Sequence, residues 1–381
     1  MPEHNHFRHQ AYEHSDSAEV EWISAGAPVA PRSGEFVSTM HRVSARLREA
    51  DIRAIYLVHG TFVGDDVLGW VRKLRTIWPS SSEWLQQLHK QLADGLMQDA
   101  GNYTVAFAGL LERALNLTGQ SSIPVRLFRW SGENHHVGRA DAAVRLLHEL
   151  EESGDTNGRV LIWGHSHGGN VLALLTNLLG ADRETLQAFF HAARSYYRWP
   201  GTRHVDQPIW RQMQRLLRSG NQHTRGERLD IVTFGTPIRY GWDRAGYARL
   251  AHVVNHRPQA NLRPDCAAFP PSVEDVLDAA HGDCVQQLGI AGTNWPPTVA
   301  SWRAWVADSR LNELLQAGIR ARDLLDRLRV GLRVADEGRN FLVDYGCVTS
   351  SVVGHHAGHA VYTLPDWLAF HAELVASRLY S

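Results

Sequence analysis

The segment RVLIWGHSHGGNVLALL, residues 159–175, constrains the fold of this chain more than any other stretch. A run of β-forming residues meets a cluster of Gly, His and Ser, and a helix-forming run follows without room for a loop. Gly164, Ser166 and Gly168 make up the pattern G-x-S-x-G. So tight a turn strains the backbone of its middle residue and requires small flanking residues. The pattern predicts that the Ser166 hydroxyl projects above the carboxyl end of a sheet, where it can act as a nucleophile.

The rest of the chain alternates between short apolar runs that end in turn residues and longer stretches with helical spacing. The runs that predict strands are 54–60, 123–132, 159–164, 229–237, 250–256 and 340–346. The stretches that predict helices are 82–101, 139–153, 169–180 and 364–379. Because strands that alternate with helices form parallel sheets, we expect an α/β fold with a mainly parallel central sheet covered by helices on both faces.

Two long stretches, at about 182–228 and 264–338, interrupt this alternation. Both contain helix-like pieces rich in Trp, Pro and Arg, and they predict insertions that pack as a helical cap. The alternative is that they form peripheral helices without a role at a site. The expected organisation is a polar leader with edge elements over residues 1–50, followed by one domain over residues 51–381.

The charge and cysteine content exclude several classes of partner. The 381 residues include 39 Lys and Arg and 40 Asp and Glu, so no net field attracts nucleic acid or an anionic membrane. No window approaches 18 consecutive apolar residues, so we expect no integral membrane segment. Three cysteines without CxxC spacing argue against a disulfide framework and favour a cytoplasmic location.

The segment HSHGGN matches a metal-binding motif in part. His165 and His167 fit the start of the pattern H-x-H-x-D-H, but Gly169 and Asn170 stand where an Asp and a third His are required. We therefore expect no metal at this segment, and we expect both His side chains to have packing or substrate-facing roles.

At this point the chain resembles the α/β-hydrolase superfamily, in particular its lipases and esterases. Besides the Ser166 turn, the resemblance includes HGTF (59–62), FGTP (234–237) and GHHAGHAVYTLPDWLAFH (354–371). It implies an ester hydrolase with a Ser–His–acid triad and no cofactor. In this reading, backbone N–H groups of Thr61, Phe62 and His167 bind the oxyanion.

The base of such a triad comes late in the chain, because the order in this fold is Ser, acid, His. His359 is the first choice, since Tyr362 follows it at the three-residue spacing often seen in lipases. His356 and His355 are alternatives, whereas His371 lies inside the last predicted helix and is assigned a structural role.

Three carboxylates compete for the role of the acid. Asp344 is the first choice because it ends an apolar run fifteen residues before His359. Asp283, in HGDCV, resembles the turn that carries the acid in several lipases, and Asp243 follows the FGTP strand. Fungal-type lipases carry an acid after the next strand, where this chain reads NHRPQANLRP and has none.

The functional hypothesis is a serine hydrolase that cleaves a small-molecule or lipid-like carboxylic ester through an acyl-enzyme on Ser166. An acyltransferase or a thioesterase would use the same triad, and a non-catalytic hydrolase-fold binding module is a further alternative. In WSGENHHVGRAD (130–141), Glu133, Asn134, His135 and His136 either contact substrate or cap and brace the following helix.

Overall fold

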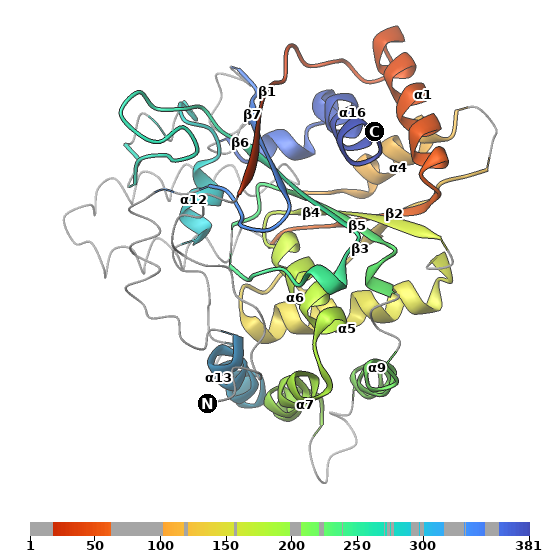
Figure 1. Cartoon of the computed structure of the whole chain (residues 1–381), viewed down its shortest axis with the longest axis vertical. Coiled ribbons are helices and arrows are strands. Elements are labelled where there is room, and N and C mark those ends of the chain that lie inside the picture. Colours follow the sequence, from red (N-terminus) through yellow and green to blue (C-terminus); the bar gives the residue numbers. More distant parts are fainter. Residues whose placement is uncertain are drawn as a thin grey trace.

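One parallel sheet organises the chain (Figure 1). The computed structural model describes residues 18–61, 102–117, 121–155, 158–198, 207–220, 225–237, 239–269, 271–272, 275, 278–290, 297, 301–315, 331, 333–346 and 358–381. Its strands are β1 (Glu19–Ser24), β2 (Ile52–Val58), β3 (Val125–Phe128), β4 (Arg159–His165), β5 (Leu229–Phe234), β6 (Arg249–Asn255) and β7 (Arg339–Asp344). They lie in the order β1-β7-β6-β5-β4-β2-β3, and every neighbouring pair is parallel. The predicted α/β class with a parallel sheet is confirmed.

Helices cover both faces of this sheet, as predicted (Figure 1). On one face lie α5 (His136–Glu152) and α6 (Gly168–Gly180), and on the other lie α1 (Gly34–Glu49), α4 (Val105–Leu115) and α16 (Leu368–Leu379). The core has a separate cluster of apolar side chains on each side. Because both faces are covered, β4, β5 and β6 are buried almost throughout, which explains their continuous apolar sequences.

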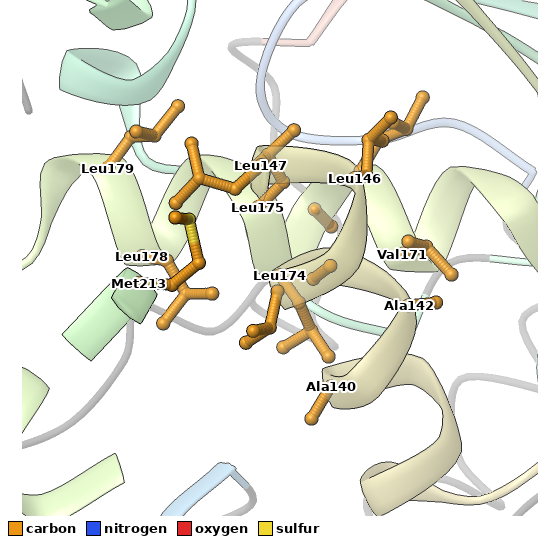
Figure 2. Packing of buried hydrophobic residues seen from close by; sticks show 14 of the residues in the cluster. Ala140, Ala142, Leu146, Leu147, Val171, Leu174, Leu175, Leu178, Leu179 and Met213 are labelled. Carbon is orange, nitrogen blue, oxygen red and sulfur yellow. The ribbon is translucent and has the colours of Figure 1, made fainter. Parts of the chain in front are cut away.

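The layer next to the sheet is built on helix α6, whose residues are buried on every side. Leu146 and Leu147 of α5 pack with Leu174 and Leu178 of α6, and Met213 joins the same cluster (Figure 2). A helix that is apolar all round must lie between two layers. Helix α6 accordingly contacts both the sheet, at β4 and β5, and the neighbouring helix α5.

Residues 18–50 contribute more to the fold than the edge elements expected there. Strand β1 is the edge strand and pairs with β7 in parallel register. Helix α1 packs on α16 and α4 and buries Phe36, Met40 and Val43 in the core. The first domain boundary, drawn at residue 50, thus falls between two elements of one core.

Two of the helices in the insertions pack against α5. From the first insertion come α7 (Arg183–Ala192), α8 (Arg194–Tyr197) and α9 (Pro208–Arg218), and from the second come α12 (Cys284–Ile290) and α13 (Trp302–Leu315). Helices α9 and α13 contact α5, and α7 contacts both of them. In Figure 1 these three lie on the far side of α5 and α6 from the sheet. Their proposed role as a cap over the site stays a prediction.

Three short 3-10 helices complete the described elements: η4 (Arg244–Gly246), η6 (Ala360–Thr363) and η7 (Pro365–Trp367). The predicted helix 82–101, Phe62, His355 and His356 lie outside the described residues. In the part of the chain that the structure describes, no helix has both the length and the apolar character needed to cross a membrane.

Acidification is expected to destabilise the fold through His371. This residue is fully buried in α16, and burial lowers its pKa from 6.5 to about 3. Between these two values the unfolded chain binds a proton that the folded chain does not, so the stabilisation is complete above about pH 6.5 and is lost as the pH falls. Urea unfolding of the wild type should show this loss, at about 1.4 kcal/mol per pH unit for this one group. His371→Phe should have a correspondingly shallower pH dependence, and equal slopes would contradict the assignment.

Candidate active site

Ser166 occupies the strained turn that the sequence predicted. Strand β4 ends at His165 and α6 begins at Gly168. Ser166 has a φ of +51°, a left-handed conformation that is costly for a residue with a Cβ. Its backbone N–H donates to the carbonyl of Phe234 at the end of β5 (2.9 Å). The surrounding structure thus holds the strain in place, as expected for a turn that presents a side chain for chemistry.

The glycines of the turn are required by close packing. A Cβ on Gly168 would lie 2.5 Å from the carbonyl oxygen of Val58, and one on Gly164 would lie 2.7 Å from the side chain of Leu172. A Cβ on Gly169 would overlap Thr236, whose hydroxyl donates to the carbonyl of Ser166 (2.8 Å). The FGTP segment therefore closes the turn from the neighbouring strand.

The HGTF loop passes directly over the Ser166 side chain. A Cβ on Gly60 would lie 2.7 Å from the Cβ of Ser166 and 3.3 Å from its Oγ. The N–H of Gly60 donates to Oδ1 of Asn102 (3.0 Å), and Thr61 is buried beside it. This contact brings the predicted oxyanion loop to Ser166, although Phe62 lies outside the described residues.

His59 braces this loop as a neutral imidazole. Its Nδ1 lies 2.6 Å from the carbonyl of Gly60, and its Nε2 accepts from the N–H of Trp130 (3.2 Å). The indole of Trp130 donates in return to the carbonyl of His59 (2.8 Å). Burial lowers the pKa of His59 and so favours the neutral ring, and the two contacts of its nitrogens favour the tautomer that donates from Nδ1 and accepts at Nε2.

His359 pairs with Asp283, and both are buried. Nδ1 of His359 lies 2.7 Å from Oδ2 of Asp283, whose side chain is completely inaccessible. The same oxygen accepts from the hydroxyl of Tyr362 (3.0 Å). The other carboxylate oxygen accepts from the N–H of Gln286 (2.8 Å) at the start of α12, as in a helix N-cap. These donors orient the carboxylate toward the imidazole.

The predicted pairing of Asp344 with His359 is wrong. Asp344 accepts from Nε of Arg257 (2.7 Å) and from the N–H of Gly346 (2.8 Å), and its side chain is half exposed. It ends β7, but its carboxylate is held in a surface ion pair. The third candidate, Asp243, caps the 3-10 helix η4 by accepting from the N–H of Ala245 (3.0 Å). Of the three carboxylates, Asp283 is therefore the partner of His359.

His165 links the Asp283–His359 pair to the Ser166 turn. The rings of His165 and His359 lie 4.7 Å apart between centroids, and the ring of Tyr362 lies 5.9 Å from that of His165. Since His165 directly precedes Ser166, this packing brings His359 to the turn that carries Ser166. His165 thus has the packing role that was one of its two predicted roles.

His167 opens α6 directly after Ser166, where its N–H belongs to the positive end of the helix. Burial, and then the positive charges of Arg139 and Arg239, lower the pKa of His167 well below its usual value. Its Nδ1 lies 3.1 Å from the side-chain amide of Asn170. The imidazole is therefore neutral and tied to the first turn of the helix.

The polar segment 130–141 caps and braces α5. His135 accepts from the N–H of Gly138 (2.9 Å), and His136 lies 2.7 Å from the hydroxyl of Tyr240. Arg139 donates to Tyr240 (2.8 Å) and to Asn134 (2.6 Å). These contacts fit the bracing alternative, and they anchor α5 beside the carboxyl end of the sheet.

Two residues at this site, Asn255 and Arg333, were missed by sequence reasoning. The amide of Asn255 donates to the carbonyl of Gly358 (2.9 Å), and the buried guanidinium of Arg333 donates to the carbonyl of Asp283 (2.6 Å). The available signal for Asn255 was its place at the end of an apolar strand that carries no acid. No sequence signal distinguishes Arg333 from the other arginines of its insertion.

Comparisons of the chain with protein-family models, with curated proteins and with solved structures find no match. The fold and the site describe an α/β protein whose Ser166 turn and Asp283–His359 pair meet at the carboxyl edge of a parallel sheet.

Proposed function

We propose that this protein is a serine hydrolase of the α/β-hydrolase type that cleaves carboxylic esters through an acyl-enzyme on Ser166. The observation that carries the proposal is the position of His359. His359 is hydrogen-bonded to the buried Asp283, and its ring packs against that of His165, the residue directly before Ser166. A nucleophile, a base and an orienting acid in one place are the minimum for acyl transfer by serine.

In this proposal Oγ of Ser166 attacks the ester carbonyl while His359 accepts the hydroxyl proton. Asp283 holds the Nδ1–H tautomer of His359 and stabilises the imidazolium that forms. Backbone N–H groups of Thr61 and His167 stabilise the oxyanion. His359 then protonates the departing alkoxide, and the C–O bond of the ester breaks to leave the acyl-enzyme. Water, deprotonated by His359, releases the carboxylic acid and restores Ser166.

The proposed substrate is a small-molecule or lipid-like ester, an expectation that comes from the Trp-rich sequence of the two insertions. The proposed location is the cytoplasm, in keeping with three cysteines that lack disulfide spacing. Product analysis with and without an added alcohol separates hydrolysis from acyl transfer, since a transferase would form a new ester.

The proposal is tested with a fluorophosphonate probe. Oγ of Ser166 forms a bond to phosphorus, fluoride leaves, and His359 takes the proton, so the wild type should gain one covalent label, measurable by intact-protein mass spectrometry. Ser166→Ala should gain none. Ser195→Ala is the matched control, because Ser195 is a similarly buried serine that donates to the carbonyl of Arg303 (3.0 Å), and it should label like the wild type. An unlabelled wild type, or a labelled Ser166→Ala, would refute the proposal.

A further inference from the structure

The end of strand β6 is where the acid loop and the base loop of the proposed site meet. Asn255, the last residue of β6, is buried, and three of its polar groups reach these loops. Its carbonyl accepts from the N–H of Asp283 (2.8 Å), and its side-chain amide donates to the carbonyl of Gly358 (2.9 Å). Its own N–H donates to the hydroxyl of Tyr362 (2.7 Å), which donates in turn to Asp283.

Two glycines allow this close approach, and each directly precedes a residue of the pair. Gly282 and Gly358 have φ values of +91° and +85°. A Cβ on Gly282 would overlap the carbonyl of Asn255, and a Cβ on Gly358 would overlap the carbonyl of Gly282 and lie 3.1 Å from the amide nitrogen of Asn255. The backbone segments Gly282–Asp283 and Gly358–His359 therefore pack against each other, and both contact Asn255.

On these contacts, and on the proposed function, we infer that Asn255 is a positioning residue: its side-chain amide holds the base loop at the distance at which His359 meets Asp283. One backbone bond of Asn255 reaches Asp283 and the other reaches the hydroxyl of Tyr362, and neither depends on the Asn255 side chain. Only the side-chain amide N–H reaches the residue directly before His359. The chemistry requires a donor at this position, because a carboxylate would face the carbonyl of Gly358 and repel it.

The charge of the neighbourhood explains why an amide serves where a carboxylate would not. The buried carboxylate of Asp283 already lies beside His359, and a second buried carboxylate close by would repel it. Burial, and then the charge of Asp283, raise the pKa of Tyr362, so its hydroxyl stays protonated and remains a donor to Asp283. In the described part of the chain, the carboxylate of Asp283 thus remains the one anion beside His359, and fixed hydrogen-bond donors surround it.

The test compares Asn255→Asp, which keeps the shape but removes the donor, with Asn340→Asp. Asn340 is equally buried, and its amide donates to the carbonyl of Ala335 (2.9 Å) near the opposite end of the sheet. We expect Asn255→Asp to lower kcat for a p-nitrophenyl ester by on the order of 100-fold with little change in KM, because a misplaced base slows the chemical step. Asn340→Asp should keep the wild-type kcat in its folded fraction.

Labelling rates measured over a pH series distinguish a positioning role of Asn255 from a purely structural one. As the pH falls from 8 to 6, the carboxyl group of Asn255→Asp gains a proton and with it a donor for Gly358. The ratio of its fluorophosphonate labelling rate to that of the wild type should therefore rise. A constant ratio, or an equal loss of kcat in both variants, would overturn the inference. If Asn255→Asp does not fold, Asn255→Ala removes the donor without adding charge and should show the same loss of kcat.

A spectroscopic measurement separates this inference from the proposed function. With ¹⁵N-labelled histidine, the Nδ1–H of His359 should give a far-downfield proton resonance that is absent in His359→Ala. It should also be weakened or lost in Asn255→Asp but kept in Asn340→Asp. Its retention in Asn255→Asp would overturn the positioning role. An unlabelled wild type that keeps the resonance would refute the hydrolase proposal alone.

Discussion

Asp283→Asn is expected to lower kcat for a p-nitrophenyl ester by roughly 10⁴-fold, as loss of the acid does in triads of this kind. The carboxylate is inaccessible to solvent and accepts at Oδ2 from His359 (2.7 Å) and Tyr362 (3.0 Å). An amide NH₂ facing Nδ1 would require the opposite tautomer of the imidazole, so Nε2 would carry the proton and could not accept one from Ser166. Steady-state kinetics measures the loss.

Asp344→Asn is the matched control, because both changes remove one charge and keep the shape. The Asp344 side chain is half exposed in an ion pair with Arg257, and such pairs contribute about 0–1 kcal/mol. We expect its kcat within about twofold of the wild type, since so small an energy does not reach the site. Circular dichroism and thermal unfolding should show that Asp283→Asn is folded. A collapse of turnover in Asp344→Asn, with activity kept in Asp283→Asn, would contradict the assignment of the acid.

Gly60→Ala is expected to lower kcat by on the order of 100-fold. The added Cβ would lie 2.7 Å from the Cβ of Ser166, closer than side-chain carbons approach each other. Either the HGTF loop or the Ser166 side chain must move, and a displacement of about 1 Å at a reacting group costs about 100-fold in rate. The rate of fluorophosphonate labelling should fall with kcat, because both depend on the position of the same oxygen.

Gly34→Ala is the control for this change. Gly34 begins α1, has no neighbour within 4 Å of an added Cβ, and should tolerate alanine with wild-type kinetics. The two variants add the same methyl group to the chain, so a difference between them reports the contact with Ser166. Wild-type labelling of Gly60→Ala would show that the HGTF loop does not lie over the nucleophile.

The strand and helix pattern could be predicted because it depends on local properties. The described strands begin and end within a few residues of the runs that predicted them, since apolar runs broken by Gly mark buried parallel strands. Strand β1 was not predicted as a strand, because its alternate exposed residues at the sheet edge give it no continuous apolar run. Helix α4 falls in a stretch for which no element was predicted.

The choice of the acid shows where local reasoning fails. Asp344 was preferred because it is close to His359 in sequence, but Asp283, 76 residues away, makes the hydrogen bond. The two loops meet because β6 and β7 are neighbours in the sheet and because Asn255 bonds to both. Spacing along the chain carries no information about which loops share an edge of the sheet.

The sequence by itself determined the Ser166 turn and the alternation of strands and helices, because the conformational needs of Gly, the strain at one residue and apolar periodicity act over a few neighbouring positions. Only the tertiary structure decided which acid faces His359, which residue joins their loops and where the insertions pack. Those contacts link segments far apart in the chain, and their geometry is set by the order of the strands and the close packing of the layers.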